Sequence, residues 1–457
     1  MNTTRRSLLK SGCCGLMSAT PALSTLLNME LACASVNNTN PTDYKALVCI
    51  LLSGGNDSWN MLVPHDDEPF KEYSRTRGAL ALNLNGSDGA LPLAGSANSD
   101  RRFAVHPACR NIQKLFNSGK ASFLSNVGTL IEPTTVKQYR AGSRQLPRSL
   151  FSHLDQRTQW QTAVPQSDAR SGWIGRATEL LIDNSQAAGK VSMNISLVGN
   201  NILQTGLNTM TPYSISSNGS LRMATTWLKR ILQQSETRNL FEEEYRSLIN
   251  NSIELEKEFS AAFEPTHITT DFPHSNKLAQ ELKAVAKTIA ARQSLGHKRQ
   301  TFFVTIDGWD HHQDLIRNHN SLLEQLDSAL LSFNNTIEEL GLSNNVTTFT
   351  ISDFGRALVS NGNGTDHGWG GNSLIMGGAI QGAEILGTYP ETLRIGNGMD
   401  IGHNGRLLPT TSCDEYFYEL LRWFGVENTH FDVVLPNLNN FIPSKSETTS
   451  IGIYNAY

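Results

Sequence analysis

The chain has 457 residues, a formal net charge of -4 at pH 7 and 39% hydrophobic residues, an ordinary composition for a globular protein. This length is sufficient to bury a large core in one domain or two. The chain lacks the clustered Lys and Arg that neutralise a phosphate backbone, so its composition argues against a nucleic-acid partner.

Residues 1–34 have the features of a bacterial twin-arginine export signal. Arg5 and Arg6 precede a weakly apolar stretch, and an A-x-A cleavage pattern ends at Ala34. The alternative is a chance pair of arginines before a soluble helix. We expect the twin-arginine export machinery to deliver the chain to the periplasm or the cell exterior, with residues 35–43 as a linker. Beyond the leader, no window is long and apolar enough for a transmembrane segment.

Residues 44–52 form a largely apolar run, which predicts a strand in a parallel sheet with both faces covered. A glycine-rich turn follows, and Asp57 within it would face the crevice where such sheets bind ligands. The alternative is a turn-forming aspartate without a ligand role. Residues 65–105 contain many Gly, Asn, Ser and Pro residues and predict a surface excursion rather than core.

Ser152 lies at the start of a short helical pattern and allows two interpretations. Asp155, three residues later, is in the position of a capping-box partner, although Glu or Gln is usual there, and the Ser152 hydroxyl would then cap the helix. In the other interpretation, a metal ion and the helix end activate this hydroxyl as a nucleophile. Further along, helical spacing of apolar residues near 221–296 predicts an inserted helical layer.

A polar cluster follows the predicted strand at residues 300–306. Two carboxylates and two imidazoles occur there within six residues: Asp307, Asp310, His311 and His312. Charged groups beside a buried strand need partners, so the cluster favours metal or anion binding over a solvated loop. A helix near residues 322–337 then leads to the next strand and completes a β-α-β unit.

The densest cluster of polar groups follows a β-branched strand at residues 346–351. Asp353 comes directly after this strand, and a loop rich in Asn and Gly brings His367 back toward it. A carboxylate and an imidazole that meet at a strand end suit a divalent metal ion. Arg356 carries the planar fork that can pair with an anionic substrate. A final amphipathic helix is predicted at residues 412–424.

Outside the leader the chain keeps three cysteines, Cys49, Cys109 and Cys413. They lack the spacing of paired metal ligands. Cys49 lies in the first apolar run and is expected in the core. The sequence does not decide whether Cys109 and Cys413 form a disulfide.

Six ordered motifs in the mature chain resemble the exported bacterial family DUF1501: GGNDSWNMLVP, HP at position 106, SHLDQ, GWDHHQ, SDFGR and TDHGWGG. That family is held to have a fold similar to the alkaline phosphatase and sulfatase superfamily. The resemblance implies one α/β domain over residues 44–457, with a mostly parallel sheet covered by helices on both faces and with the helical insertion.

The resemblance also implies a site with two kinds of residue. Ser152 and Arg356 are the candidate catalytic residues, Ser152 at the nucleophile position. Superfamily phosphatases usually carry a histidine directly after the later aspartate, where this chain has Phe354, so His311 and Asp307 are the candidates to replace that ligand. The metal ligands would correspond to five residues: Asp57, Asp310, His312, Asp353 and His367.

The function implied by the resemblance is an exported metal-dependent hydrolase of phosphate or sulfate esters. It would hold one or two divalent ions, from among zinc, manganese, magnesium and calcium, and act on a small anionic ester. The alternative is a relative without catalysis that serves as a binding or scaffolding protein at the cell envelope, because a fold does not imply one function.

Overall fold

The computed structural model describes residues 43–86, 88–95, 100–182, 191–208, 210–219, 240–442 and 451–454. These residues belong to one compact unit, Pro41–Tyr457. The expected leader, residues 1–34, and nearly all of the expected linker lie outside the described residues. Among the helices that are described, none has the length and apolar character needed to cross a membrane.

A central sheet of nine strands organises the described chain, in the order β13-β5-β12-β9-β1-β8-β6-β7, with β14 beside β5. In this sheet β12 pairs antiparallel with both neighbours, and the other pairings are parallel. The predicted mostly parallel sheet is therefore confirmed. The strands are β1 (Lys45–Ser53), β5 (Ala121–Gly128), β6 (Asn194–Ser196), β7 (Tyr213–Ser214), β8 (Arg299–Asp307), β9 (Val346–Ser352), β12 (Gly371–Met376), β13 (Ile385–Gly387) and β14 (Thr411–Ser412).

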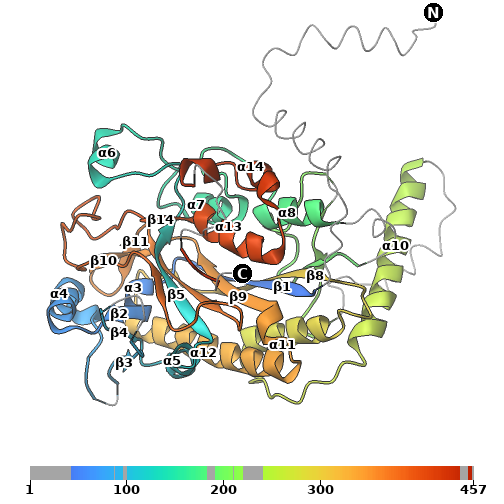
Figure 1. The fold of residues 1–457 in the computed structure, drawn as a ribbon, viewed down its shortest axis with the longest axis horizontal. Coiled ribbons are helices and arrows are strands. Elements are labelled where there is room, and N and C mark those ends of the chain that lie inside the picture. Colours follow the sequence, from blue (N-terminus) through green and yellow to red (C-terminus); the bar gives the residue numbers. More distant parts are fainter. Residues whose placement is uncertain are drawn as a thin grey trace, which may run out of the picture. The chain divides into compact units, whose positions relative to one another are not determined.

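Helices cover both faces of this sheet, as predicted (Figure 1). One face carries α5 (Arg110–Asn117), α11 (Lys277–Ala290) and α12 (Leu315–Glu339). The other carries α7 (His153–Thr162), α8 (Trp173–Leu181), α13 (Cys413–Phe424) and α14 (Phe431–Val434). The β8-α12-β9 segment is the β-α-β unit expected from the sequence, because β8 and β9 both run parallel to β1.

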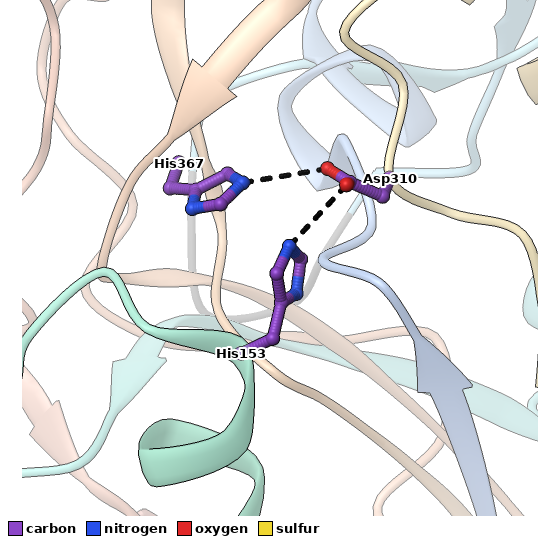
Figure 2. Close-up of side chains that lie close together, drawn as sticks. All are labelled: His153, Asp310 and His367. Carbon is purple, nitrogen blue, oxygen red and sulfur yellow. Dashed lines mark ion pairs between the residues drawn. The ribbon is translucent and has the colours of Figure 1, made fainter.

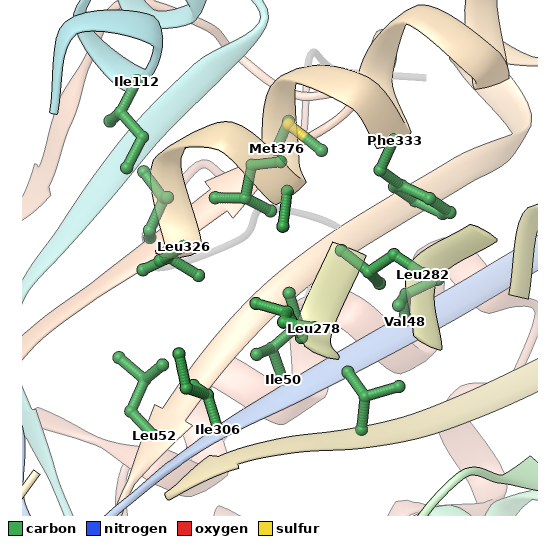
Figure 3. Close-up of a cluster of buried hydrophobic side chains, with 14 of the residues drawn as sticks. Val48, Ile50, Leu52, Ile112, Leu278, Leu282, Ile306, Leu326, Phe333 and Met376 are labelled. Carbon is green, nitrogen blue, oxygen red and sulfur yellow. The ribbon is translucent and has the colours of Figure 1, made fainter. Parts of the chain in front are cut away.

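Alternation along β1 explains the two layers. Val48, Ile50 and Leu52 point toward α11 and α12, where they meet Leu278 and Leu326 (Figure 3). Successive strand residues face opposite sides, so the intervening residues of β1 are buried against the other helical layer. Full burial of each such aliphatic side chain contributes about 1.5–3 kcal/mol of transfer free energy.

Two sequence predictions differ from the structure. α11, near the end of the insertion predicted at 221–296, packs directly on the sheet with Leu278 and Leu282 in the main core, whereas residues 221–239 of that prediction lie outside the described residues. Residues 65–105 are not merely surface: β4 within them is fully buried and pairs with β2 and β3. Strands of two or three residues are too short to show a periodic pattern, and tertiary contacts bury them. The elements concerned are β2 (Leu62–Pro64), α4 (Asp67–Arg77), β3 (Leu91–Pro92), β4 (Phe103–Val105) and α10 (Leu240–Phe263).

The last predicted helix is confirmed as α13. Ser412 caps it, Glu415 completes a capping box, and Gly425 ends it in the left-handed conformation with φ +110°. Cys49, Cys109 and Cys413 are buried free thiols, so the disulfide left open by the sequence is not formed. The remaining elements are α3 (Ser58–Met61), α6 (Val136–Ala141), β10 (Arg356–Ser360) and β11 (Thr365–His367).

Candidate metal centre

The carboxyl ends of three neighbouring strands meet at one edge of the sheet. β1 runs parallel to both β8 and β9, with Ser53 opposite Asp307. Asp310 follows β8 and Asp353 follows β9 at this edge. Gly54 lets the turn after β1 approach the site closely: its φ is +121°, and a Cβ there would lie 2.5 Å from the backbone nitrogen of Asp310.

Three side chains from distant segments point at one another here: His153, Asp310 and His367 (Figure 2). One ligand atom of each lies within 4.8 Å of the others. His153 Nε2 is 3.4 Å from Asp310 Oδ2, and His367 Nε2 is 3.4 Å from Asp310 Oδ1. His153 opens α7 and His367 ends β11, so rigid elements deliver both imidazoles.

Each of these histidines is oriented by an acceptor behind it. Nδ1 of His153 lies 2.8 Å from Asp353 Oδ2, and Nδ1 of His367 lies 2.7 Å from the backbone oxygen of Phe151. Because a carboxylate and a carbonyl can only accept, each Nδ1 carries a proton, which makes Nε2 the lone-pair nitrogen of the neutral imidazole. Nε2 of His153 is buried and has no hydrogen-bond partner in the described chain. Such an orphaned lone pair, aimed at a carboxylate, fits a metal ligand.

Aromatic packing and backbone conformation hold the same two imidazoles. The ring of Phe354 lies 4.8 Å from that of His153 and 4.6 Å from that of His367, measured between centroids. Phe354 therefore packs against both imidazoles and restricts their orientation. Phe151 has φ +72°, a conformation that non-glycine residues rarely adopt, and its carbonyl accepts from His367. Strain of this kind concentrates at functional sites.

His312 is a fourth candidate metal ligand beside this cluster, and its Nε2 donates a proton to His367 Nε2 that metal binding would release. Its Nε2 lies 2.8 Å from His367 Nε2 and 3.1 Å from Asp310 Oδ1. Its side chain is 42% exposed, which opens this side of the site to solvent. Three imidazoles and one carboxylate form a donor set typical of zinc and compatible with manganese.

Arg356 favours the ionised form of Asp310 through a hydrogen bond and its positive charge. Burial raises the pKa of the Asp310 carboxyl, but the hydrogen bond and charge of Arg356 lower it more, so that its pKa lies below the ordinary value. The Arg356 guanidinium is 0% exposed and donates to Asp310 Oδ1 at 2.9 Å, to the Gly54 carbonyl at 3.1 Å and to the Thr365 carbonyl. These contacts bury Arg356 behind Asp310 and away from solvent. The sequence had predicted instead that Arg356 pairs with an anionic substrate.

Burial lowers the pKa of His367, with further lowering by the nearby charges of His153 and Arg356. The hydrogen bond to the Phe151 carbonyl opposes this shift. His367 is therefore held neutral, the form that can bind a metal ion.

Asp57 and Asp353 lie apart from the clustered ligand atoms, each paired with an arginine. Asp57 is fully buried in an ion pair with Arg77, itself fully buried. Asp353 is fully buried and accepts two hydrogen bonds from Arg157, at 3.0 Å and 2.9 Å. Of the five predicted ligands, the structure thus gathers three, Asp310, His312 and His367, around a shared point.

Ser152 is the N-cap of α7. Its hydroxyl accepts from the backbone nitrogen of Asp155 at 3.5 Å and donates to Asp155 Oδ2 at 2.6 Å. It directly precedes His153 in the chain, so it lies next to the cluster. This geometry satisfies the capping interpretation and leaves the nucleophile role a prediction.

His153 and Arg157 were not predicted as functional residues from the sequence. They stand four residues apart on α7, so they share one helical face, and both contact Asp353. The four-residue spacing of His153 and Arg157, directly after the N-cap Ser152, was the sequence feature that could have identified them. His311, considered as a replacement ligand, is buried beside the ring of His319, and Asp307 is exposed at the strand end.

Several solved structures are similar to this chain at low scores. The crystal structure of Ps i-CgsB in complex with k-i-k-neocarrahexaose has a TM-score of 0.35 and 11% identity, covering 87% of this chain and 77% of that chain. The PsFucS1 sulfatase from Pseudoalteromonas sp. has a TM-score of 0.33 and 12% identity, covering 89% and 71%. A protein in the alkaline phosphatase superfamily from Vibrio parahaemolyticus has a TM-score of 0.30 and 12% identity, covering 79% and 70%. Scores this low carry no argument about the chemistry of this chain.

No curated protein matches the sequence. The family described as a protein of unknown function, DUF1501, matches residues 44–396, which include every ligand of the candidate metal centre. The match spans well over half of the chain, and this chain belongs to the DUF1501 family.

Proposed function

We propose that this chain hydrolyses a phosphate or sulfate ester with one divalent cation held by His153, Asp310, His312 and His367. The observation that carries the proposal is the convergence of oriented imidazole lone pairs on an ionised carboxylate. The imidazole-rich donor set favours zinc or manganese over magnesium and calcium, which prefer oxygen ligands. When bound, the cation supplies a Lewis acid that polarises the ester and lowers the pKa of a hydroxyl or water.

A single ion is proposed because the carboxylates expected to hold a second one are already neutralised. Arg77 pairs with Asp57, and Arg157 pairs with Asp353 through two hydrogen bonds. Displacing the fully buried Arg77 guanidinium from Asp57 would leave an uncompensated buried charge, which costs about 3–5 kcal/mol.

The chain's own residues divide the remaining tasks. Asp353 and the Phe151 carbonyl fix the tautomers of two ligands, and Arg356 keeps Asp310 ionised. Ser152 is the candidate nucleophile, and Asp155 Oδ2 is the group placed to accept its proton. The partner in this proposal is a small anionic ester.

The chain is proposed to act outside the cytoplasm, in the periplasm or the medium. The support is the Arg5-Arg6 pair and the cleavage pattern ending at Ala34. Cell fractionation of a strain that carries Arg5→Lys and Arg6→Lys tests it: retention of the double variant in the cytoplasm is expected, and unchanged export would refute a twin-arginine route.

Elemental analysis and ester turnover on the purified protein test the function. We expect about one zinc or manganese ion per chain, and loss of the ion in His153→Ala and Asp310→Ala. Exposed His274→Ala is the matched control and should keep the ion. Metal-loaded protein should release nitrophenol from p-nitrophenyl phosphate or p-nitrophenyl sulfate, and this release should stop when a chelator removes the ion.

Two outcomes would contradict the proposal in different ways. A protein that takes up no ion would remove the metal centre. A protein that holds the ion but turns over neither ester would favour a binding or scaffolding role at the cell envelope.

A further inference from the structure

Arg406 contacts the backbone of the proposed ligand His367 and the ring of Phe151. Its Nε donates to the backbone oxygen of the ligand His367 at 2.8 Å. Its guanidinium lies over the ring of Phe151, 4.5 Å from the centroid. Phe151 also accepts from His367 Nδ1, so the three residues form a closed unit around one ligand. Arg406 is half-buried, and only its Nε donor is used by this tether.

The charge of Arg406 is not neutralised by the described chain. Arg77, Arg157 and Arg356 each pair with a carboxylate at the site or beside it. No carboxylate of the described residues lies within ion-pair distance of Arg406, and none of their atoms accepts from its two Nη atoms. The Nη atoms are not among the buried polar atoms that lack a partner, so they are open to solvent, where an anion can reach them and form charge-assisted hydrogen bonds.

We infer that Arg406 binds the tetrahedral oxyanion of the substrate, a phosphate or sulfate group, through its Nη edge. The inference rests on the proposed function and adds a residue that determines the anionic substrate class. A guanidinium fixed by stacking and by a tether at Nε presents its remaining donors as a fork, the geometry that suits phosphate and sulfate oxygens. Arg406 lies beyond residues 44–396, so the family match does not assign it.

Isothermal titration calorimetry of inorganic phosphate and of sulfate into the metal-loaded full chain tests this inference. Arg406→Gln should weaken anion binding by about tenfold or more, because it removes the charge and the fork. Arg406→Lys keeps the charge without the fork and should lose part of the affinity. Comparing the two anions distinguishes a phosphate site from a sulfate site.

Arg102→Gln is the matched control because it makes the same charge change at an exposed arginine paired with Asp66. It should leave anion affinity unchanged. Metal content is measured on every sample, and thermal unfolding checks that each variant is folded. If Arg406→Gln does not fold, the comparison rests on Arg406→Lys.

Equal affinities in wild type and folded Arg406 variants would overturn the inference, and so would a metal-loaded wild type that binds neither anion. A wild type without metal would instead overturn the proposed function, and with it this inference. For the ester, loss at Arg406 should appear mainly as a higher KM, since the oxyanion is present before and during the reaction.

Discussion

Asp353 lies behind the proposed metal ligand His153, where an orienting partner is expected. Its Oδ2 accepts from Nδ1 of His153 at 2.8 Å, while Arg157 and the backbone nitrogen of Gly54 saturate the rest of the carboxylate. Carboxylates that orient ligating histidines contribute to affinity without supplying a ligand atom.

We therefore predict that Asp353→Asn weakens metal affinity by about 10–100-fold but preserves the stoichiometry at saturation. Asp310→Asn should abolish binding, because it removes the charge of a ligand. Competition titrations against a chelator measure both. Asp168→Asn changes an almost fully exposed carboxylate and serves as the control. If Asp353→Asn lost the ion even at saturation, Asp353 would be a ligand after all.

Among the helices, α7 carries both a stabilising cap and a proposed metal ligand at its N-terminus. Ser152 caps it, and the next residue, His153, is a proposed ligand. One substitution can therefore alter the helix and the reaction together, so the two effects need different replacements.

Ser152→Ala removes cap and hydroxyl together and should lower the free energy of unfolding by about 1 kcal/mol. Ser152→Asn retains a capping oxygen and should restore that stability. If Ser152 is the nucleophile, both variants keep the metal and lose ester turnover. Urea denaturation and p-nitrophenyl ester assays separate the effects. Turnover that survives in Ser152→Asn would reduce Ser152 to a cap.

Elements with strong periodic patterns were predictable from sequence. The apolar runs of β1, β8 and β9 and the amphipathic α12 and α13 appear where their patterns indicate. The polar residues that follow β8 and β9 likewise predicted that Asp310 and His367 would share a site. The position of a residue after a strand does not, however, indicate which helix packs beside that strand end. His153 lies on α7, and so it was not predicted as part of the site.

The partners of the buried carboxylates were not predictable for a related reason. Arg157 and Asp353 are 196 residues apart, and Arg77 meets Asp57 only through the fold of α4. Sequence shows which carboxylates stand at strand ends. Whether a cation or an arginine neutralises each of them depends on tertiary contacts.

For the whole molecule, buried titratable groups set how stability depends on pH. Burial lowers the pKa of His106 to about 4, whereas the unfolded chain titrates near its ordinary value. Between about pH 4 and 6.5 the unfolded chain therefore binds more protons at His106, so this group makes stability fall as pH falls. Asp327 acts in the opposite direction, because burial raises its pKa to about 6. Between about pH 4 and 6 the folded chain binds more protons there, and this contribution to stability declines as pH rises.

The two groups can be separated by substitution in metal-free protein, where release of an ion does not contribute. We predict that His106→Gln lowers the slope of the free energy of unfolding against pH between 4.5 and 6 by about 1.4 kcal/mol per pH unit, because it removes a positive contribution to that slope. Asp327→Asn should raise this slope by a similar amount, because it removes a negative contribution. Urea denaturation at several pH values measures both slopes. Parallel curves for wild type and His106→Gln would mean that His106 titrates alike in the folded and unfolded chains, and would contradict its burial as a neutral imidazole.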